Sequence, residues 1–424
     1  MSQLKKNLTI WSGTILFLNI VIGAGLLVLP GLAYQQVGEV AIISWMVCAI
    51  VSMPLLLVFI ILGENFPDSG GIAHYAKRAF GPWLQKTSAF LFLGAVIFGL
   101  PSVALTSAYY LDSILPFEVH SYAAILLLAA ASAHFFAGDY LNRLLAIIGS
   151  SVIIVLLVLL VIGYMGLELP ITHMPTAPSF NFMEDNLLVI LSPFMMIFFA
   201  FTGWEVGSHA AEEFKKPRRD FRLAMGLSFI IATILYFAIA LLVHLSAIDK
   251  GFESPFIEVT RPILGENGKY AVAIAATLLI FANLFGAIWG VSRLTYSLGR
   301  DGILPKSLGV TRNGNPLVAV AVVLVFVLLA TGLDYSGMIN LKTMLSLAGQ
   351  NFLILYAIAA FALYRLSQRL VHKLLSVLVI GIALTVLYFT GTVILYPILI
   401  IAVATIFHLN QKRRGKKAAG RNEG

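Results

Sequence analysis

Two short glycine-containing stretches interrupt apolar segments of this chain. The first is "VIGAGLLVLPG" (21–31), in which Gly23 and Gly25 precede Pro30, and the second is "FTGWE" (201–205). An interior glycine costs a helix about 1 kcal/mol relative to alanine, and an interior proline costs about 3 kcal/mol. Non-helical backbone is tolerated inside a membrane only where it lines a cavity or is buried in protein. The two stretches therefore predict broken membrane helices that together form a binding site.

The backbone groups released at the two breaks are complementary. The half-helix that starts near Leu26 presents free N–H groups and the positive end of its dipole, which suit a carboxylate. Carbonyl groups released at "FTG" (201–203) suit an ammonium group. The pair predicts a site for the α-amino and α-carboxylate groups of a free amino acid, although Gly23 and Gly25 would also suit a close-packing helix face. The predicted substrate-binding residues are Ile22, Gly23, Ala24, Gly25, Leu26, Phe201, Thr202, Gly203 and Trp204.

Glu205 is the one acidic residue predicted beside these breaks. A charge deep in a membrane helix costs about 2.5–3.5 kcal/mol on insertion scales and tends to be functional. We expect Glu205 to carry a coupling proton; the alternative is a carboxyl group that only hydrogen-bonds the loose backbone of its helix. Asn283, Gln350 and Asn351 lie in the middle of other apolar segments, where they can either contact substrate or join neighbouring helices. Because the predicted pocket holds no other charge, an apolar amino acid fits better than arginine, lysine or a polyamine.

These residues must be positioned by helices that cross a membrane. Hydrophobic residues make up 59% of the 424-residue chain and charged residues 11%, whereas a soluble domain is about 25% charged. Runs of about 18 or more apolar residues indicate transmembrane helices. The runs predict twelve spans, near residues 9–36, 39–63, 83–112, 121–136, 141–166, 187–213, 222–247, 270–298, 316–333, 339–364, 373–389 and 392–409.

Lysine and arginine predict the orientation of the spans. If the N-terminus is cytoplasmic, the only basic residues of the 28 that fall on the outer side are Lys250, Arg261, Lys269 and Lys342. Both termini are then cytoplasmic, and residues 411–424 form a basic cytoplasmic tail. These topology charges, which also meet anionic lipid head groups, explain the net charge of +8. We therefore expect membrane lipids, and not nucleic acid, as partners.

The two breaks lie at matching places in the two halves of the chain. Each lies about fourteen residues into its span, and the two spans enter the membrane from opposite faces. Interrupted spans at matching positions are typical of inverted repeats with a substrate site at the midplane. We therefore predict one transporter domain over residues 1–410, with repeats near 9–166 and 187–364 and two extra helices near 373–409.

Four motifs give the chain a family resemblance. In order, they are "IGAGLLVLPG" (22–31), "FPDSGGIAHYAKRAFGP" (66–82), "FFAFTGWEVGSHAAEEFKKPRRDF" (198–221) and "GRDGILP" (299–305). They resemble the first helix, the first cytoplasmic loop, the broken sixth helix and the segment after the eighth helix of the amino acid–polyamine–organocation (APC) transporters. Within that superfamily, the sequence is most similar to a bacterial branch of inner-membrane exporters of methionine and branched-chain amino acids. The resemblance implies an all-α polytopic membrane protein with the LeuT-type fold, in which two inverted five-helix repeats precede two further helices.

Residues and resemblance together predict a secondary active transporter of neutral apolar L-amino acids. We expect it to export methionine, leucine, isoleucine and valine across the bacterial inner membrane by proton antiport and alternating access. A sodium- or proton-coupled importer, or an exchanger, of the same substrates remains the alternative. An enzyme would need a nucleophile–base pair or metal ligands near mid-membrane, and a channel would need a continuous polar lining; the sequence offers neither. No metal or other cofactor is expected, and the oligomeric state stays open.

Overall fold

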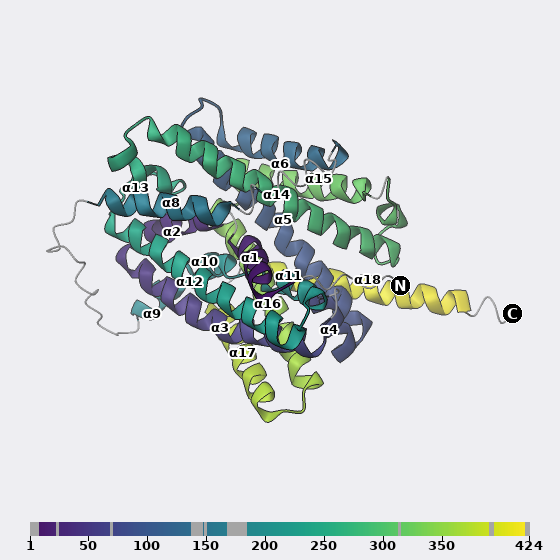
Figure 1. The fold of residues 1–424 in the computed structure, drawn as a ribbon. Helices are drawn as coiled ribbons and strands as arrows, with labels where there is room; N and C mark the ends of the chain where they lie inside the picture. The colour runs from purple at the N-terminus through teal and green to yellow at the C-terminus, as the bar shows by residue number, and fades with distance from the viewer. Residues whose placement is uncertain are drawn as a thin grey trace.

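The computed structural model describes residues 8–22, 25–67, 71–136, 147, 151–167, 185–312, 315–389 and 394–419. Within these ranges the extended regular elements are helices. The long helices lie side by side in one bundle, with α13 (Pro255–Leu264) and α4 (Gly71–Phe80) toward opposite ends of it (Figure 1).

The first half of the chain contains α1 (Ile10–Val21), α2 (Gly25–Val37), α3 (Ala41–Asn65), α5 (Pro82–Asp112), α6 (Val119–Phe136) and α8 (Val152–Met165). The second half contains α9 (Asp185–Leu191), α10 (Phe194–Ala200), α11 (Trp204–Gly207), α12 (Arg222–Leu245), α14 (Gly268–Arg300), α15 (Leu317–Tyr335) and α16 (Leu341–Leu366). Two further helices, α17 (Leu370–Phe389) and α18 (Leu395–Ala419), complete the chain. Short helical segments occur at η1 (Gly38–Val40), η3 (Ser208–Glu213), η4 (Pro217–Phe221) and η5 (Lys306–Gly309).

Seven helical stretches of the described residues are long and apolar enough to cross a membrane. The apolar stretches of α6, α8 and α18 are shorter, at Val119–Phe135, Ile153–Met165 and Leu395–Asn410. The predicted spans 9–36 and 187–213 are occupied by broken helices, namely α1 with α2, and α9 to α11 with η3. In its described residues, each predicted span therefore coincides with a helix or with a broken helix. The predicted all-α polytopic class is confirmed.

The packing brings the two broken spans together at the centre of the bundle. Helix α1 contacts α11 and α12, while α2 contacts α10. Helix α16 packs along α10 and α5. A Cβ atom on Gly349 of α16 would lie 2.4 Å from the carbonyl oxygen of Met195, so only glycine permits this close approach of α16 to α10.

Several boundaries differ from the predicted ones. Helix α18 continues to Ala419, so most of the predicted tail 411–424 extends the last helix, and α17 begins at Leu370 instead of 373. Helix α13 was not predicted, because it is short and amphipathic and therefore escapes a search for long apolar runs. It follows Ser254 and starts with Pro255, a residue favoured at the first helical position. Of the predicted span 141–166, the described part is residue 147 and residues 151–166.

Candidate functional site

The first break separates α1 from α2. Helix α1 ends at Val21, and the N–H group of Ile22 still donates to the carbonyl oxygen of Leu18 at 2.7 Å before the backbone leaves helical geometry. Helix α2 begins at Gly25, so its first N–H groups have no partner within the helix. Gly23 and Ala24 lie outside the described residues. Of the other predicted site residues here, Ile22, Gly25 and Leu26 are buried at the break.

The second break separates α10 from α11. The N–H groups of Phe201 and Thr202 bond to carbonyl oxygens three residues earlier, at 2.9 and 3.3 Å, which tightens the last turn of α10. Gly203 then has a φ of +109°, a conformation that residues with a side chain rarely adopt. Phe201 and Trp204 are each 1% exposed and Thr202 is 8% exposed. The helix is thus interrupted at Gly203, as predicted, and the neighbouring residues are buried.

A tyrosine of α12 connects the two breaks. The Tyr236 hydroxyl lies 3.0 Å from the carbonyl oxygen of Val21 and 2.8 Å from that of Ala200. These carbonyl groups end α1 and α10, where a helix leaves its last acceptors without partners. A hydroxyl has one proton to donate, so it cannot satisfy both carbonyl groups fully at once. The arrangement fixes the distance between the two helix ends and leaves acceptor capacity for a further donor, such as an ammonium group.

Glu205 lies directly after the second break and is 1% exposed. Its Oε2 atom accepts hydrogen bonds from the N–H group of Gly203 at 3.0 Å and from the hydroxyl of Tyr356 at 2.6 Å. The first bond is the backbone contact expected if the carboxyl group only supports its helix. The second ties α11 to α16, a helix outside the two broken spans. The carboxyl group is therefore held between a half-helix and α16, and its role in proton coupling stays a prediction.

Phe199 of α10 stands beside the first break. A Cβ atom on Gly25 would lie 3.6 Å from its ring, and one on Gly99 of α5 would lie 3.4 Å away. On the α16 side, the Phe199 ring centre lies 6.4 Å from that of Phe352. The start of α2 therefore faces an apolar aromatic wall, and small residues surround that wall on two sides.

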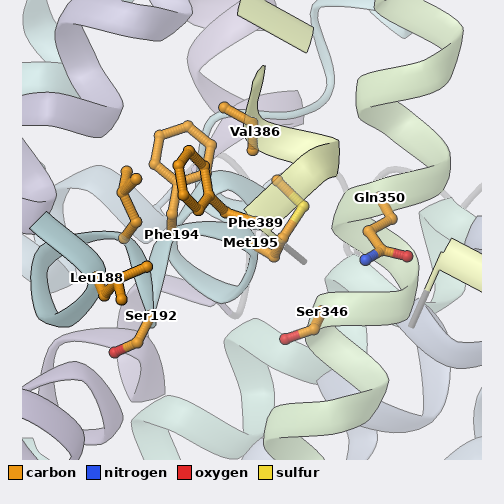
Figure 2. Close-up of a pocket in the computed structure, with 9 residues that line it drawn as sticks. Leu188, Ser192, Phe194, Met195, Ser346, Gln350, Val386 and Phe389 are labelled. Carbon is orange, nitrogen blue, oxygen red and sulfur yellow. The ribbon is translucent and has the colours of Figure 1, made fainter. Parts of the chain in front are cut away.

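The remaining predicted pocket residues lie on α14 and α16. Asn351 is fully buried, and its amide nitrogen donates to the carbonyl oxygen of Leu347 at 2.8 Å, within its own helix. Gln350 is also fully buried but lines a separate cavity (Figure 2). Asn283 is partly buried on α14. Among the described residues, no hydrogen bond joins any of these three side chains to the residues of the two breaks.

A cavity of about 330 Å³ adjoins the second break behind Phe201 and Tyr236. Its rim includes Met46 and Ile50 of α3, which are 46% and 72% exposed. Apolar side chains exposed on a membrane-spanning helix face lipid. This cavity therefore opens toward lipid, and it lies behind the ends of α1 and α10 that Tyr236 joins.

Two residues of the site, Tyr236 and Tyr356, were not predicted from the sequence. Each is the only hydroxyl-bearing aromatic residue in a short apolar run, "ILYFAIA" (234–240) and "LILYAIAA" (353–360). A tyrosine placed mid-span needs a partner for its hydroxyl. That requirement was the available signal, but it does not say which helix supplies the partner.

Several known proteins are similar in sequence to this chain along most of its length. A family model described as amino acid permease matches residues 8–414. The chain is 29% identical to an uncharacterized amino acid permease of Bacillus subtilis, YecA, over 98% of both chains. It is 25% identical to the L-methionine/branched-chain amino acid exporter YjeH of Escherichia coli, over 95% of this chain and 96% of that protein. It is also 25% identical to the human cystine/glutamate transporter, over 80% of this chain and 70% of that protein. The chain therefore belongs to the amino acid permease family of the APC superfamily and is an amino acid transport protein of the membrane.

Proposed function

We propose that the protein is a secondary active transporter that exports neutral apolar L-amino acids, chiefly methionine, leucine, isoleucine and valine, by proton antiport. The observation that carries the proposal is the pair of buried helix breaks joined by Tyr236 beside an apolar aromatic wall. The Escherichia coli relative, which is described as an exporter of methionine and branched-chain amino acids, supports the same substrate class.

In this proposal each part of the substrate has its own contact. The α-carboxylate accepts hydrogen bonds from N–H groups of residues 23–26, at the positive end of α2. The α-ammonium group donates to the carbonyl groups of Val21 and Ala200, which Tyr236 satisfies only in part. The side chain lies against Phe199. An apolar wall separates side chains that differ by one methylene only about 10- to 200-fold, so the four substrates overlap.

Proton antiport supplies enough free energy for export. Moving a substrate against a hundredfold gradient costs about 2.7 kcal/mol, at about 1.4 kcal/mol per tenfold. One proton entering down 100 mV supplies about 2.3 kcal/mol, and a pH difference of one unit adds about 1.4 kcal/mol. One proton per substrate is therefore sufficient, and the burial of Glu205 beside the second break supports it as the carrier.

The orientation proposed from Lys and Arg places both termini in the cytoplasm and α13 on the outer side. The α2 side of the bundle is closed in this structure: the Tyr110 hydroxyl donates to the carbonyl oxygen of Leu27 at 2.8 Å, and α13 packs against α2. We infer a conformation that is sealed on the outer side, one of the states that alternating access requires.

Transport by purified protein in liposomes tests the function directly. Vesicles loaded with radiolabelled methionine or leucine are given a pH gradient and a sodium gradient in separate experiments. We expect the pH gradient alone to drive concentrative movement, with leucine, isoleucine and valine competing and with lysine and glutamate excluded. Movement driven by sodium would favour the importer, gradient-independent one-for-one exchange would favour the exchanger, and strong lysine transport would contradict the apolar site.

The carboxylate contact has its own test. Methionine methyl ester lacks the carboxylate and should compete poorly with methionine. Gly25→Val should abolish binding because even a Cβ atom there would lie 3.1 Å from Leu29 and 3.6 Å from Phe199. Gly226→Val is the matched control, since a Cβ atom at that position meets nothing within 4 Å. Equal competition by the ester would remove the carboxylate assignment.

A further inference from the structure

A second cavity, of about 300 Å³, lies between α9, α10, α16 and α17 (Figure 2). None of the residues of the two breaks lines it. Helix α9 lies toward the same end of the bundle as α13 (Figure 1). The cavity is lined by Leu188, Leu191, Ser192, Phe194, Met195, Ser346, Gln350, Val386 and Phe389.

Gln350 is the polar side chain of this lining whose hydrogen bonds are unused. It is fully buried, and neither its amide oxygen nor its amide nitrogen has a partner among the described residues. Figure 2 shows its amide group projecting from α16 toward the side of the cavity formed by α10. The hydroxyl groups of Ser346 and Ser192 already donate to backbone carbonyl oxygens of their own segments, at 2.8 and 2.9 Å. A buried amide without a partner is unfavourable, so the cavity favours a ligand that bonds Gln350.

The mouth of the cavity is apolar and exposed. Leu188 and Phe389 are 57% and 41% exposed, and apolar side chains that are exposed on membrane-spanning helices face lipid. The cavity also lies close to helix ends, because Phe389 is the last residue of α17 and Ser346 lies five residues after the start of α16 at Leu341. The mouth therefore opens to the bilayer near the boundary between acyl chains and head groups, on the α13 side.

The chemistry of the lining selects the ligand. Its side chains carry no formal charge, and bringing an amino acid zwitterion or a phosphate into such a site would be costly. A neutral carbonyl group attached to a long apolar chain fits both Gln350 and the leucine, phenylalanine and valine side chains. The ester group of a membrane lipid lies at the boundary between acyl chains and head groups, and Gln350 lies nine residues into α16, so the ester must enter the cavity beyond its mouth to meet the amide. We propose that this cavity binds one acyl chain of a phospholipid, with the ester carbonyl oxygen accepting a hydrogen bond from Nε2 of Gln350.

Photolabelling tests the proposal on the whole protein in nanodiscs. The probe is a trace of diacyl phosphatidylethanolamine with a diazirine in one acyl chain, and the adducts are mapped by peptide mass spectrometry. We expect adducts in residues 188–195 and 346–350. Val386→Trp fills the cavity and should remove them, whereas Leu384→Trp, a position on the same helix that is 64% exposed and outside the lining, should leave them unchanged.

The role of Gln350 is isolated by a second pair of changes. Gln350→Leu keeps the side-chain size and removes the amide, and an ether-linked probe keeps the acyl chain and removes the carbonyl. Each change alone should lower the adducts about tenfold, and the two together should lower them no further. Methionine binding by each variant confirms that the protein is folded. Unchanged adducts in Val386→Trp would overturn the acyl-chain site, and equal labelling of Gln350→Leu and parent by the ester probe would overturn the hydrogen bond.

Discussion

One carboxylate oxygen of Glu205 accepts hydrogen bonds from two donors in different parts of the fold, the Gly203 backbone N–H group and the Tyr356 hydroxyl. We predict that Glu205→Gln keeps substrate exchange but loses the pH dependence and the concentrative export. Glutamine retains the shape and an acceptor oxygen but cannot bind and release the proton. Tyr356→Phe is the matched change, because it removes one bond and leaves the carboxyl group, so its transport should still respond to pH. If transport by Glu205→Gln follows pH as the parent does, the coupling proton is carried elsewhere.

The Tyr236 hydroxyl holds the ends of α1 and α10 at a fixed separation. Tyr236→Phe should keep the ring contacts with Phe201 and Trp45, whose centres lie 5.1 and 5.9 Å away. The change removes the hydroxyl that fixes the distance between the Val21 and Ala200 carbonyl groups, and a hydrogen bond of this kind contributes about 0.5–1.5 kcal/mol. We expect methionine binding to weaken roughly 2- to 10-fold, because the two carbonyl groups are no longer held in position for the ammonium group. Tyr164→Phe removes a similar bond, a 2.9 Å contact with the Ala238 carbonyl oxygen, and should bind methionine normally. If Tyr164→Phe lost as much affinity for methionine as Tyr236→Phe, the bridge made by Tyr236 would have no specific role in binding.

At the scale of elements, the start of α6 is held by a charged cap. The Glu118 carboxylate accepts the backbone N–H groups of His120 and Ser121 at 3.1 and 3.0 Å. His120 also contacts Asp334 of α15 at 2.7 Å, which joins the two helices. Partial burial raises the pKa of the Glu118 carboxyl, but the hydrogen bonds from His120 and the backbone outweigh it, so the net pKa lies below its usual value. A depressed pKa contributes stability above the unfolded pKa of about 4.3 and loses it as pH falls through the folded value.

Glu118→Ala should therefore lower the free energy of unfolding at pH 7 by about 0.5–2 kcal/mol, the range for loss of a helix cap. The difference from the parent should shrink as the pH is lowered below about 4, because the parent then loses the same interaction. Thermal unfolding in detergent at several pH values measures both effects. Glu266→Ala is the control, because Glu266 is 72% exposed and its pair with Arg261 is long, at 3.3 Å. A pH-independent difference would indicate lost packing instead of a lost charge.

Elements of this protein differ in how far the sequence predicts them. The spans are predicted by apolar runs that are long enough to cross a bilayer. The breaks are predicted by glycines, because glycine destabilises the interior of a helix. The bridges do not follow, because Tyr236 and Val21 are 215 residues apart and Tyr356 and Glu205 are 151 apart. The sequence predicts Gln350 as a mid-span polar residue, but its cavity depends on where α17 packs, and no local sequence pattern determines that.

At the scale of the whole molecule, the proposed outer seal includes a close backbone contact. Residues Leu26 to Ala33 of α2 are buried. Gly31 lies so close to the loop before α13 that a Cβ atom there would be 2.1 Å from the carbonyl oxygen of Phe252. Such an approach requires glycine. We therefore expect the proposed sealed conformation to depend on Gly31, a residue that takes no part in the proposed binding of substrate.

Gly31→Ala should hold the protein away from the sealed conformation. The added methyl group meets backbone, which cannot rotate aside, so α2 and the Phe252 loop must separate. Because alternating access passes through the sealed state once per cycle, methionine transport should fall at least tenfold. In a Cys48→Ala background, Leu27→Cys, at a position that is 1% exposed, should then react several times faster with a membrane-impermeant maleimide. Gly226→Ala, where the methyl group meets nothing within 4 Å, should change neither rate. Normal transport and slow labelling in Gly31→Ala would show that this contact does not set the outer seal.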